Sequence, residues 1–225
     1  MSSGTRDIEF IYLNEEFYAT HVPVPDLDLL LAAGWRHFGE RFYRYTPGFY
    51  NSEVRVVMPL RVCLDRFRFS KSQRRCLRRN ADLECRIIPA EVTPEVEELF
   101  HAHRQRFHRD APYSLYDFLS DEPEHIPAPG LLLEVREGDT LVAASYFERG
   151  EATISSLYGM FIPGHEKRGL GIFTLLKEIE YGLDRGMRFF YPGYAYEGES
   201  FYDYKKRLGS LEYFDWQGNW MEYSP

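Results

Sequence analysis

Seven basic side chains are concentrated in residues 64–83, although the chain as a whole carries a formal net charge of -8. They are Arg66, Arg68, Lys71, Arg74, Arg75, Arg78 and Arg79. In a helix, the last five of these would fall on one arc of about 140°. Guanidinium groups suit phosphate oxygens, and like charges one turn apart destabilise a helix unless an anion neutralises them. The segment therefore predicts a face that binds a polyanion; the alternative is a solvated face paired with acids elsewhere in the chain.

A glycine-containing segment, "EKRGLGIF" at residues 166–173, is the second candidate for anion binding. It lies between a predicted strand and a predicted helix. Gly169 and Gly171 would let free backbone N–H groups at the helix N-terminus point at an anion. Coenzyme A pyrophosphate is one such anion, but the carboxylate of Glu166 would oppose it. An ordinary glycine-rich turn is the alternative.

The third candidate is "YPGYAYEGESFYDYKKRL" at residues 191–208, which contains five tyrosines among acidic and basic residues. A tyrosine ring can stack on a nucleobase and its hydroxyl can form a hydrogen bond. We expect two or three of the five to line a site, and the others to pack as half-buried aromatic residues. Glu197 and Glu199 are weak candidates for a proton acceptor, because no other residue stands out as a dedicated base.

Local signals place these segments on helices and strands. Ser70 with Gln73 forms a capping box that predicts a helix from Lys71 to about Asn80. Thr93 followed by Pro94 predicts a second helix, and a third should end at Gly186. From about residue 83 the order is strand, helix, three strands, helix, strand, helix, strand.

This order predicts a mixed α/β (α+β) fold of the GNAT acyltransferase type. We expect a small N-terminal α/β subdomain over residues 1–58, with a strand at residues 8–13, and a GNAT-like transferase domain over residues 59–225.

Composition narrows the classes of protein further. The 225 residues are 44% hydrophobic, enough for a substantial core, and no long uncharged apolar run predicts a membrane span. The start of the chain does not resemble a secretory signal. Cys63, Cys76 and Cys85 lack ligand spacing, so we expect reduced thiols, no bound metal and a cytoplasmic protein.

The motifs together resemble the aminoacyl-tRNA–protein transferases, in particular the bacterial arginyl- and leucyl-transferases of the N-degron pathway. The resemblance runs from about residue 27 to residue 208 and is carried by "LLAAGWRHFGERFYRY", "FRFSKSQRRCLRRNADL", "SSLYGMF" through "PGYAY", and "YDYKKRL". The segment "FRFSKSQRRCLRRNADL" is the most specific of these. The chain departs from the family pattern at "TPGFYNSEVRV", which lacks the family's cysteine cluster.

The resemblance implies an aminoacyl-tRNA as donor co-substrate, no other cofactor, and the N-terminal α-amine of a protein as acceptor. It implies that Lys71, Arg74, Arg75, Arg78 and Arg79 bind the donor tRNA, with Gly169 and Gly171 near its acceptor end; that Tyr158, Tyr191 and Tyr194 line the reaction cleft; and that Tyr204 and Lys205 face the acceptor, where Lys205 would bind an acidic side chain. Two alternatives stay open: a coenzyme-A-dependent N-acyltransferase on the same fold, and a non-catalytic RNA-binding paralogue.

Overall fold

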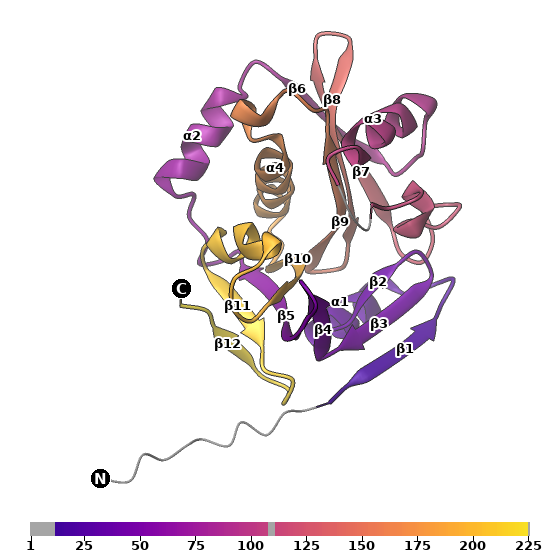
Figure 1. The fold of residues 1–225 in the computed structure, drawn as a ribbon, viewed down its shortest axis with the longest axis vertical. Helices are drawn as coiled ribbons and strands as arrows, with labels where there is room; N and C mark the ends of the chain where they lie inside the picture. Colours follow the sequence, from indigo (N-terminus) through magenta and orange to yellow (C-terminus); the bar gives the residue numbers. More distant parts are fainter. Residues whose placement is uncertain (1–11, 108–110, 225) are drawn as a thin grey trace.

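The computed structural model describes residues 12–107 and 111–224 (Figure 1). The strands are β1 (Asn14–Tyr18), β2 (Arg36–Phe38), β3 (Arg41–Tyr45), β4 (Pro47–Tyr50), β5 (Glu53–Cys63), β6 (Glu84–Pro89), β7 (Gly130–Glu137), β8 (Thr140–Arg149), β9 (Thr153–Phe161), β10 (Phe189–Tyr196), β11 (Leu211–Phe214) and β12 (Trp220–Glu222). The α-helices are α1 (Val24–Ala32), α2 (Lys71–Arg79), α3 (Pro94–Arg104) and α4 (Leu170–Asp184). Three short 3-10 helices are η1 (Leu115–Asp117), η2 (Glu166–Arg168) and η3 (Phe201–Arg207).

A large mixed sheet forms the centre of the molecule, with strand order β12-β11-β5-β10-β9-β8-β7-β6 and β4 paired to β5. Within the described residues, β10 pairs parallel with β9, whereas the other neighbouring strands pair antiparallel. A second, smaller sheet has the order β1-β3-β2. The predicted mixed α/β class is confirmed. The GNAT-like arrangement is also confirmed, because antiparallel strands β6 to β9 lead through α4 into a parallel β10.

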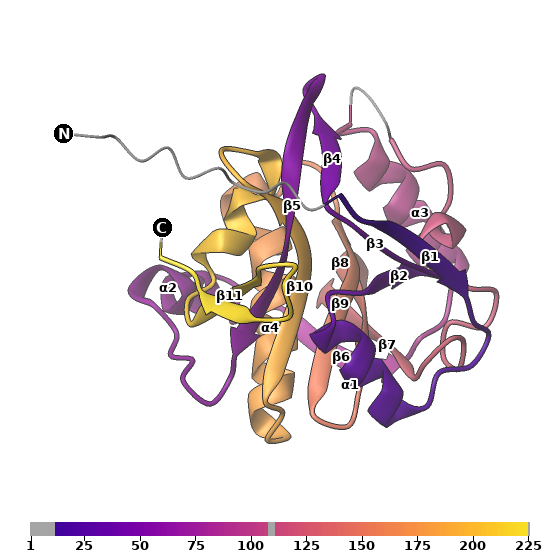
Figure 2. The same ribbon diagram turned by 90° about the horizontal axis from the view of Figure 1, so that it is seen from below.

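Helices cover both faces of the large sheet. Figure 1 shows α2 and α4 on one side of β6–β9 and α3 on the other, and Figure 2 shows the small sheet and α1 beside the α3 side. The core on the α4 side contains fully buried Leu133, Phe147 and Ile179, and the core on the α3 side contains Val96 and Tyr146. Each face of the sheet therefore has its own apolar layer.

The predicted helix ends agree with the structure because local side-chain contacts determine them. The hydroxyl of Ser70 accepts a hydrogen bond from the backbone N–H of Gln73, and the Gln73 side chain accepts one from the N–H of Ser70. Thr93 caps α3 in the same way through the N–H of Val96. Gly186 follows α4 with a φ of +66°, a conformation that favours glycine.

Two other predictions from the sequence are not confirmed by the structure. The predicted strand at residues 8–13 lies outside the described residues except for Tyr12 and Leu13, which are not in a strand. The Pro192–Gly193 dipeptide predicts a break in the strand around residue 190; β10 instead continues to Tyr196, and its pairing with β5 shifts register between Phe190 and Gly193. The strand continues because Gly193, with a φ of +95°, absorbs the shift.

The subdomain boundary at Met58 stays a prediction. β5 runs through this position, pairing with β4 before it and with β10 on both sides of it. None of the described helices has the length and apolar character needed to cross a membrane. The expected cytoplasmic location also stays a prediction.

Candidate functional site

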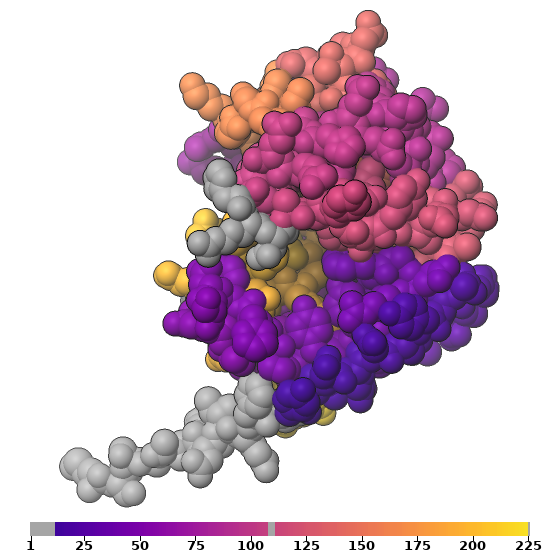
Figure 3. Space-filling model, turned by 45° about the vertical axis from the view of Figure 1, so that its right-hand side comes forward, coloured from indigo at the N-terminus to yellow at the C-terminus, as the bar shows by residue number. Residues whose placement is uncertain are grey.

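A cleft begins where β9 and β10 separate. The two strands pair only from Phe189 with Thr153 to Tyr191 with Ser155. Beyond this point the described part of β10 pairs with β5 instead, and β9 continues to Phe161 without a strand on that edge. The backbone edge of β9 after Ser155 can therefore receive an extended substrate. Figure 3 shows a hollow on one face of the molecule, between the magenta and the purple residues, with gold C-terminal residues at its floor.

An irregularity in β9 determines which side chains lie at the narrow end of the cleft. Tyr146 pairs with Tyr158, but Phe147 pairs with Ser156, so Leu157 is an extra residue in β9. Such a bulge increases the local twist and redirects side chains. Gly159, beyond the bulge, is exposed. The bulge thus adds to the separation of the two strands.

Arg36 of β2 reaches the narrow end of the cleft from the N-terminal part of the chain. Its Nη1 donates to the hydroxyl of Ser155 at 2.7 Å, and its Nη2 donates to the backbone carbonyl of Ser156. The side chain is buried, with 6% of its surface exposed. These bonds satisfy the β9 edge at the point where β10 leaves it, so Arg36 marks the apex of the cleft.

Lys205 of η3 approaches the same apex. Its Nζ donates to the backbone carbonyl of Tyr194 at 3.0 Å. A Cβ atom added to Gly193 would lie 3.0 Å from Lys205 Nζ and 3.9 Å from Arg36 Nη2, so both cations border the space left by the absent side chain. Burial, and secondarily the charge of Arg36, lower the pKa of Lys205 to about 7. Among the described residues, no carboxylate forms an ion pair with either cation.

Glu178 of α4 is an acidic group near the apex, because the charge of Arg36 acts on it. Its side chain is fully buried, and neither carboxylate oxygen has a hydrogen-bond partner in the described structure. Burial raises the pKa of Glu178 to about 7, against the opposing effects of the Ser145 and Ser156 hydroxyls and the charge of Arg36. The two hydroxyls therefore lie near the carboxylate without the geometry of a hydrogen bond. Perturbed groups that converge at a cleft are typical of functional sites.

The tyrosines predicted to line the cleft lie in different environments. Tyr194 donates its hydroxyl to the carbonyl of Gly34 at 2.7 Å, which ties β10 to the N-terminal elements. Tyr158 is half-buried and stacks on Phe118, with ring centroids 4.1 Å apart, while its hydroxyl has no partner in the described structure. Tyr191 is 2% exposed and packs in an apolar cluster with residues of α1. Their catalytic roles stay predictions.

Tyr204 was predicted to face the acceptor together with Lys205. Its ring is partly buried against the α4-side core. Burial raises the pKa of its hydroxyl to about 12, and the charge of Glu178 contributes to the shift. Tyr204 therefore lies near Glu178, on the side of the apex formed by η3. Glu197 and Glu199, the weak candidates for a base, are exposed in the loop before η3.

The basic helix α2 presents the predicted face to solvent. Its five cations, Lys71, Arg74, Arg75, Arg78 and Arg79, are all exposed. The guanidinium of Arg74 donates to the carbonyl of Phe69, and that of Arg79 donates to the carbonyl of Lys167. In the described part of the chain, Lys71, Arg75 and Arg78 have no hydrogen-bonding or ion-pair partner for their side chains. Three cations of this face thus stay available to an anion.

The glycine-containing segment lies directly against the C-terminal end of α2. Asn80 donates to the carbonyl of Arg168 at 3.0 Å, and the Cys76 thiol lies near the carbonyls of Arg168 and Gly169. Gly169 has a φ of +68° and precedes the first turn of α4. The structure therefore joins two segments about 90 positions apart in the sequence.

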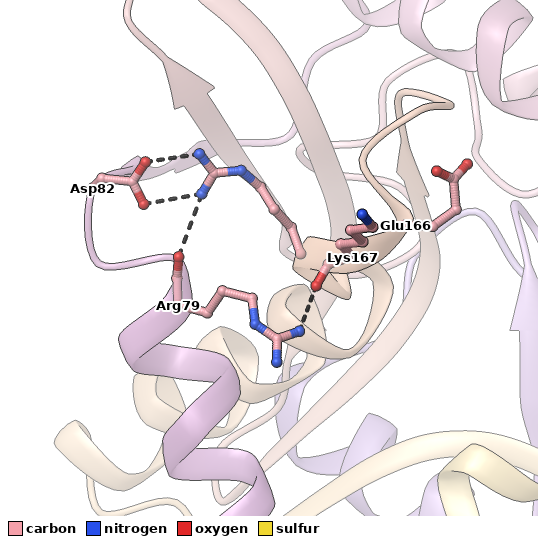
Figure 4. Close-up of a pocket in the computed structure, with 5 residues that line it drawn as sticks. Arg79, Asp82, Glu166 and Lys167 are labelled. Atoms are coloured by element: carbon pink, nitrogen blue, oxygen red, sulfur yellow. Dashed lines mark hydrogen bonds and ion pairs between the residues drawn. The ribbon is translucent and has the colours of Figure 1, made fainter.

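An open pocket of about 730 Å³ lies at this junction, lined by Arg79, Asp82, Glu166, Lys167 and Arg168 (Figure 4). Arg168 is neutralised there by Asp82, at 2.8 Å, and by Glu137, at 2.6 Å. The carboxylate of Glu166 accepts a hydrogen bond from the N–H of Gly164 at 2.9 Å, which lowers its pKa. Glu166 thus stabilises the loop that precedes α4.

Sequence reasoning missed Arg36 and Glu178. Arg36 belongs to the "GWR" segment that carries the resemblance, but no local signal connects it to β9, 119 positions away. Glu178 had a visible signal, because it lies one turn from Leu175 on the apolar side of α4. A carboxylate on the buried face of a helix is rare unless it is paired or functional.

Comparison with known proteins gives findings on both sequence and structure. A family model described as "Arginine-tRNA-protein transferase, C terminus" matches residues 95–215. The aspartate/glutamate leucyltransferase of Stenotrophomonas maltophilia (strain K279a) is 31% identical over 195 residues, covering 83% of this chain and 76% of that protein. The crystal structure of FemX has a TM-score of 0.52 at 10% identity, covering 90% of this chain and 69% of that one. The structure of L-PGS from Bacillus licheniformis has a TM-score of 0.48 at 18% identity, covering 83% and 55%.

Proposed function

The chain belongs to the arginine-tRNA–protein transferase family, and we propose that it transfers a leucyl group from tRNA to the N-terminal α-amine of proteins that begin with aspartate or glutamate. An aminoacyl transfer from tRNA to protein follows from membership of the family. The choice of leucine over arginine rests on the name of the similar S. maltophilia protein. The choice of acidic acceptors rests on that name and on the charges at the cleft.

The residues at the apex of the cleft support the proposed specificity for acidic acceptors. Lys205 and Arg36 border the space beside Gly193, and neither is paired with a carboxylate among the described residues. An Asp or Glu side chain of the acceptor would supply the missing negative charge. A charge-assisted hydrogen bond of this kind contributes on the order of 1.5–3 kcal/mol. The two cations at the apex, which no described carboxylate pairs with, are the single structural observation that supports acidic specificity.

The donor part of the proposal rests on the exposed basic face of α2 and its contact with the loop before α4. Phosphates of the tRNA would neutralise the like charges of Lys71, Arg75 and Arg78 on that face. The first turn of α4 follows Gly169, and its N-terminus favours the phosphate nearest the aminoacyl end. The aminoacyl ester would then extend from this loop along the free edge of β9 toward the apex.

The reaction needs alignment of two substrates more than a covalent enzyme intermediate. The neutral α-amine of the acceptor attacks the ester carbonyl, a C–N bond forms, and the C–O bond to the ribose breaks. The amine loses a proton and the ribose hydroxyl gains one. Binding both substrates in one cleft contributes to the rate through orientation. Backbone N–H groups of β9 beyond the point where its pairing with β10 ends could stabilise the developing oxyanion.

Transfer assays with defined donors and acceptors test the proposal. The purified protein is incubated with radiolabelled Leu-tRNA or Arg-tRNA and with peptides that begin with Asp, Glu or Ala. We expect label from Leu-tRNA on the Asp and Glu peptides, and at least tenfold less on the Ala peptide. Label from Arg-tRNA instead would reject the leucyl assignment.

Two control reactions separate the alternatives. Acetyl transfer from acetyl coenzyme A to the same peptides would favour a coenzyme-A-dependent enzyme. Binding of tRNA without transfer of any aminoacyl group would favour a non-catalytic RNA-binding protein.

A further inference from the structure

Glu178 presents a buried charge that the fold itself does not neutralise by a direct contact. Its carboxylate is fully buried in the middle of α4. The hydroxyls of Ser145 and Ser156 lie near it, but neither oxygen has a partner with hydrogen-bond geometry among the described residues. Burying such a group without a partner is costly, and native proteins retain few of them. An unpartnered buried carboxylate at a cleft indicates that its partner arrives with a ligand.

A polar strip connects Glu178 with the open part of the cleft. Thr174 lies one turn before Glu178 on α4, and its hydroxyl would be 3.6 Å from a Cβ atom on Gly159, which is exposed on β9. Ser145 borders the same space at 3.8 Å, and its own hydroxyl has no partner in the described structure. Ser156 belongs to the same strip, and its backbone carbonyl accepts the hydrogen bond of Arg36 at the apex. These small polar residues interrupt an otherwise apolar layer between α4 and the sheet.

The cations near Glu178 form their hydrogen bonds with other groups. The Nη atoms of Arg36 donate to Ser155 and Ser156, and Lys205 donates to the carbonyl of Tyr194. Arg36 acts on Glu178 only through its charge, and Tyr204 of η3 lies near enough to be affected by the charge of Glu178. Because both carboxylate oxygens lack a hydrogen-bond partner in the described structure, they can accept hydrogen bonds from an ammonium group.

We propose that Glu178 binds the α-ammonium group of the amino acid carried by the donor tRNA. This inference rests on the proposed function. An aminoacyl ester differs from a simple acyl group by this cation, which must lose water when the ester enters the cleft. A carboxylate at the apex replaces that water with a charge-assisted hydrogen bond. An ammonium held in this way has no free electron pair, so the donor amine does not compete with the acceptor amine as nucleophile.

The test compares donors with and without this charge. Transfer is measured with Leu-tRNA and with N-acetyl-Leu-tRNA, whose nitrogen is an uncharged amide, in the unmutated protein and in Glu178→Gln. We expect the unmutated protein to prefer Leu-tRNA in kcat/KM by roughly ten- to a hundredfold. Glu178→Gln should lose this preference through slower use of Leu-tRNA, with little change for the acetylated donor. Glu180→Gln, on the same helix but in an ion pair with Lys177, is the matched control and should keep the preference.

Equal losses with both donors would overturn the inference, because they would indicate a role in folding or in proton transfer. If Glu178→Gln instead keeps the donor preference but loses the decrease of kcat at low pH, that result would also overturn the inference, because it would indicate that Glu178 is a general base. Binding measurements test the preference for a charged donor without requiring turnover. Isothermal titration with a 3′-leucylamido-3′-deoxyadenosine and its N-acetyl form should show the same preference and the same loss in Glu178→Gln.

The two proposals can fail separately. If no leucyl transfer occurs but the titration shows the preference for the free ammonium, the proposed function fails and the role of Glu178 stands. If transfer occurs without any preference in either assay, only the role of Glu178 fails.

Discussion

Lys205 donates a hydrogen bond of 3.0 Å from its Nζ to the backbone carbonyl of Tyr194. This bond joins η3 to β10 beside the apex of the cleft, where Arg36 also borders the space next to Gly193. Two cations are thereby held close together, and burial, followed by the charge of Arg36, lowers the pKa of Lys205. Two neighbouring cations repel each other, and an anionic substrate would reduce this cost.

Replacing Lys205 by Ala should weaken the binding of acidic acceptors. We expect the KM for an Asp-initiated peptide to rise roughly tenfold or more, because the bond lost is worth at least about 1.4 kcal/mol. The affinity for tRNA should stay nearly constant. Lys206→Ala is the control, because Lys206 is already paired with Asp203 at 2.8 Å. Steady-state kinetics and tRNA binding measure both effects; loss of tRNA binding alone would move Lys205 to the donor side.

The KM for acidic acceptors should depend on pH. The pKa of Lys205 is lowered to about 7, so its charge is present below this pH and is lost as the pH rises through it. We expect the ratio of KM values for Asp- and Ala-initiated peptides to rise roughly tenfold from pH 6 to pH 8.5. Lys205→Arg should flatten this dependence, because the guanidinium stays charged. A ratio that does not vary with pH in the unmutated protein would contradict the prediction.

The basic face of α2 should determine the salt dependence of tRNA binding. Replacing Arg75 and Arg78 by Ala removes two unpaired cations and should reduce the slope of log K against log salt by roughly 1.4 to 1.8. Filter binding at several salt concentrations gives this slope. The matched control is Arg41 with Arg44, which are paired with Glu16 and Glu15 on the small sheet. An unchanged slope in the α2 variant would remove this helix from the tRNA-binding surface.

A buried contact between His37 and Glu148 should stabilise the packing of β2 against β8. His37 Nδ1 lies 2.8 Å from the carbonyl of Gly39, and Nε2 lies 2.5 Å from the carboxylate of Glu148. Both ring nitrogens therefore lie within hydrogen-bonding distance of a buried oxygen. Glu148→Gln should lower the free energy of unfolding by about 1–3 kcal/mol, because it disrupts a buried hydrogen bond. Urea unfolding measures this loss.

The exposed pair Arg41–Glu16 is the comparison for that measurement. Both side chains are about half exposed, so Glu16→Gln should cost less than about 1 kcal/mol. A similarly small cost for Glu148→Gln would contradict the predicted stabilising role of the contact with His37.

Glu178→Gln should stabilise the free protein at alkaline pH. The pKa of Glu178 is raised to about 7, so its ionisation costs stability as the pH rises from its ordinary value through 7. Removing the charge should raise the free energy of unfolding by at most about 3 kcal/mol at pH 8 and by little at pH 5. Unfolding curves at the two pH values test this. A loss of stability at pH 8 would indicate that Arg36 already neutralises the carboxylate.

The sequence by itself determined the features that depend on neighbours along the chain. The Ser70 and Gln73 side chains are three residues apart, so the start of α2 and the direction of its basic face follow from local hydrogen bonds and helical period. The same holds for the cap of α3 at Thr93 and for the end of α4 at Gly186. The order of these elements then identified the fold class.

Only the tertiary structure decided which side chains meet at the apex. Arg36, Glu178 and Lys205 come from β2, α4 and η3, and the separation of β9 from β10 brings them to one place. It also decided that Tyr191 packs in a core while Tyr194 bonds to Gly34. Burial and the fields of distant charges depend on packing between segments far apart in the chain. A sequence pattern indicates the periodicity of a helix or strand, but it does not indicate which other helix or strand packs against it.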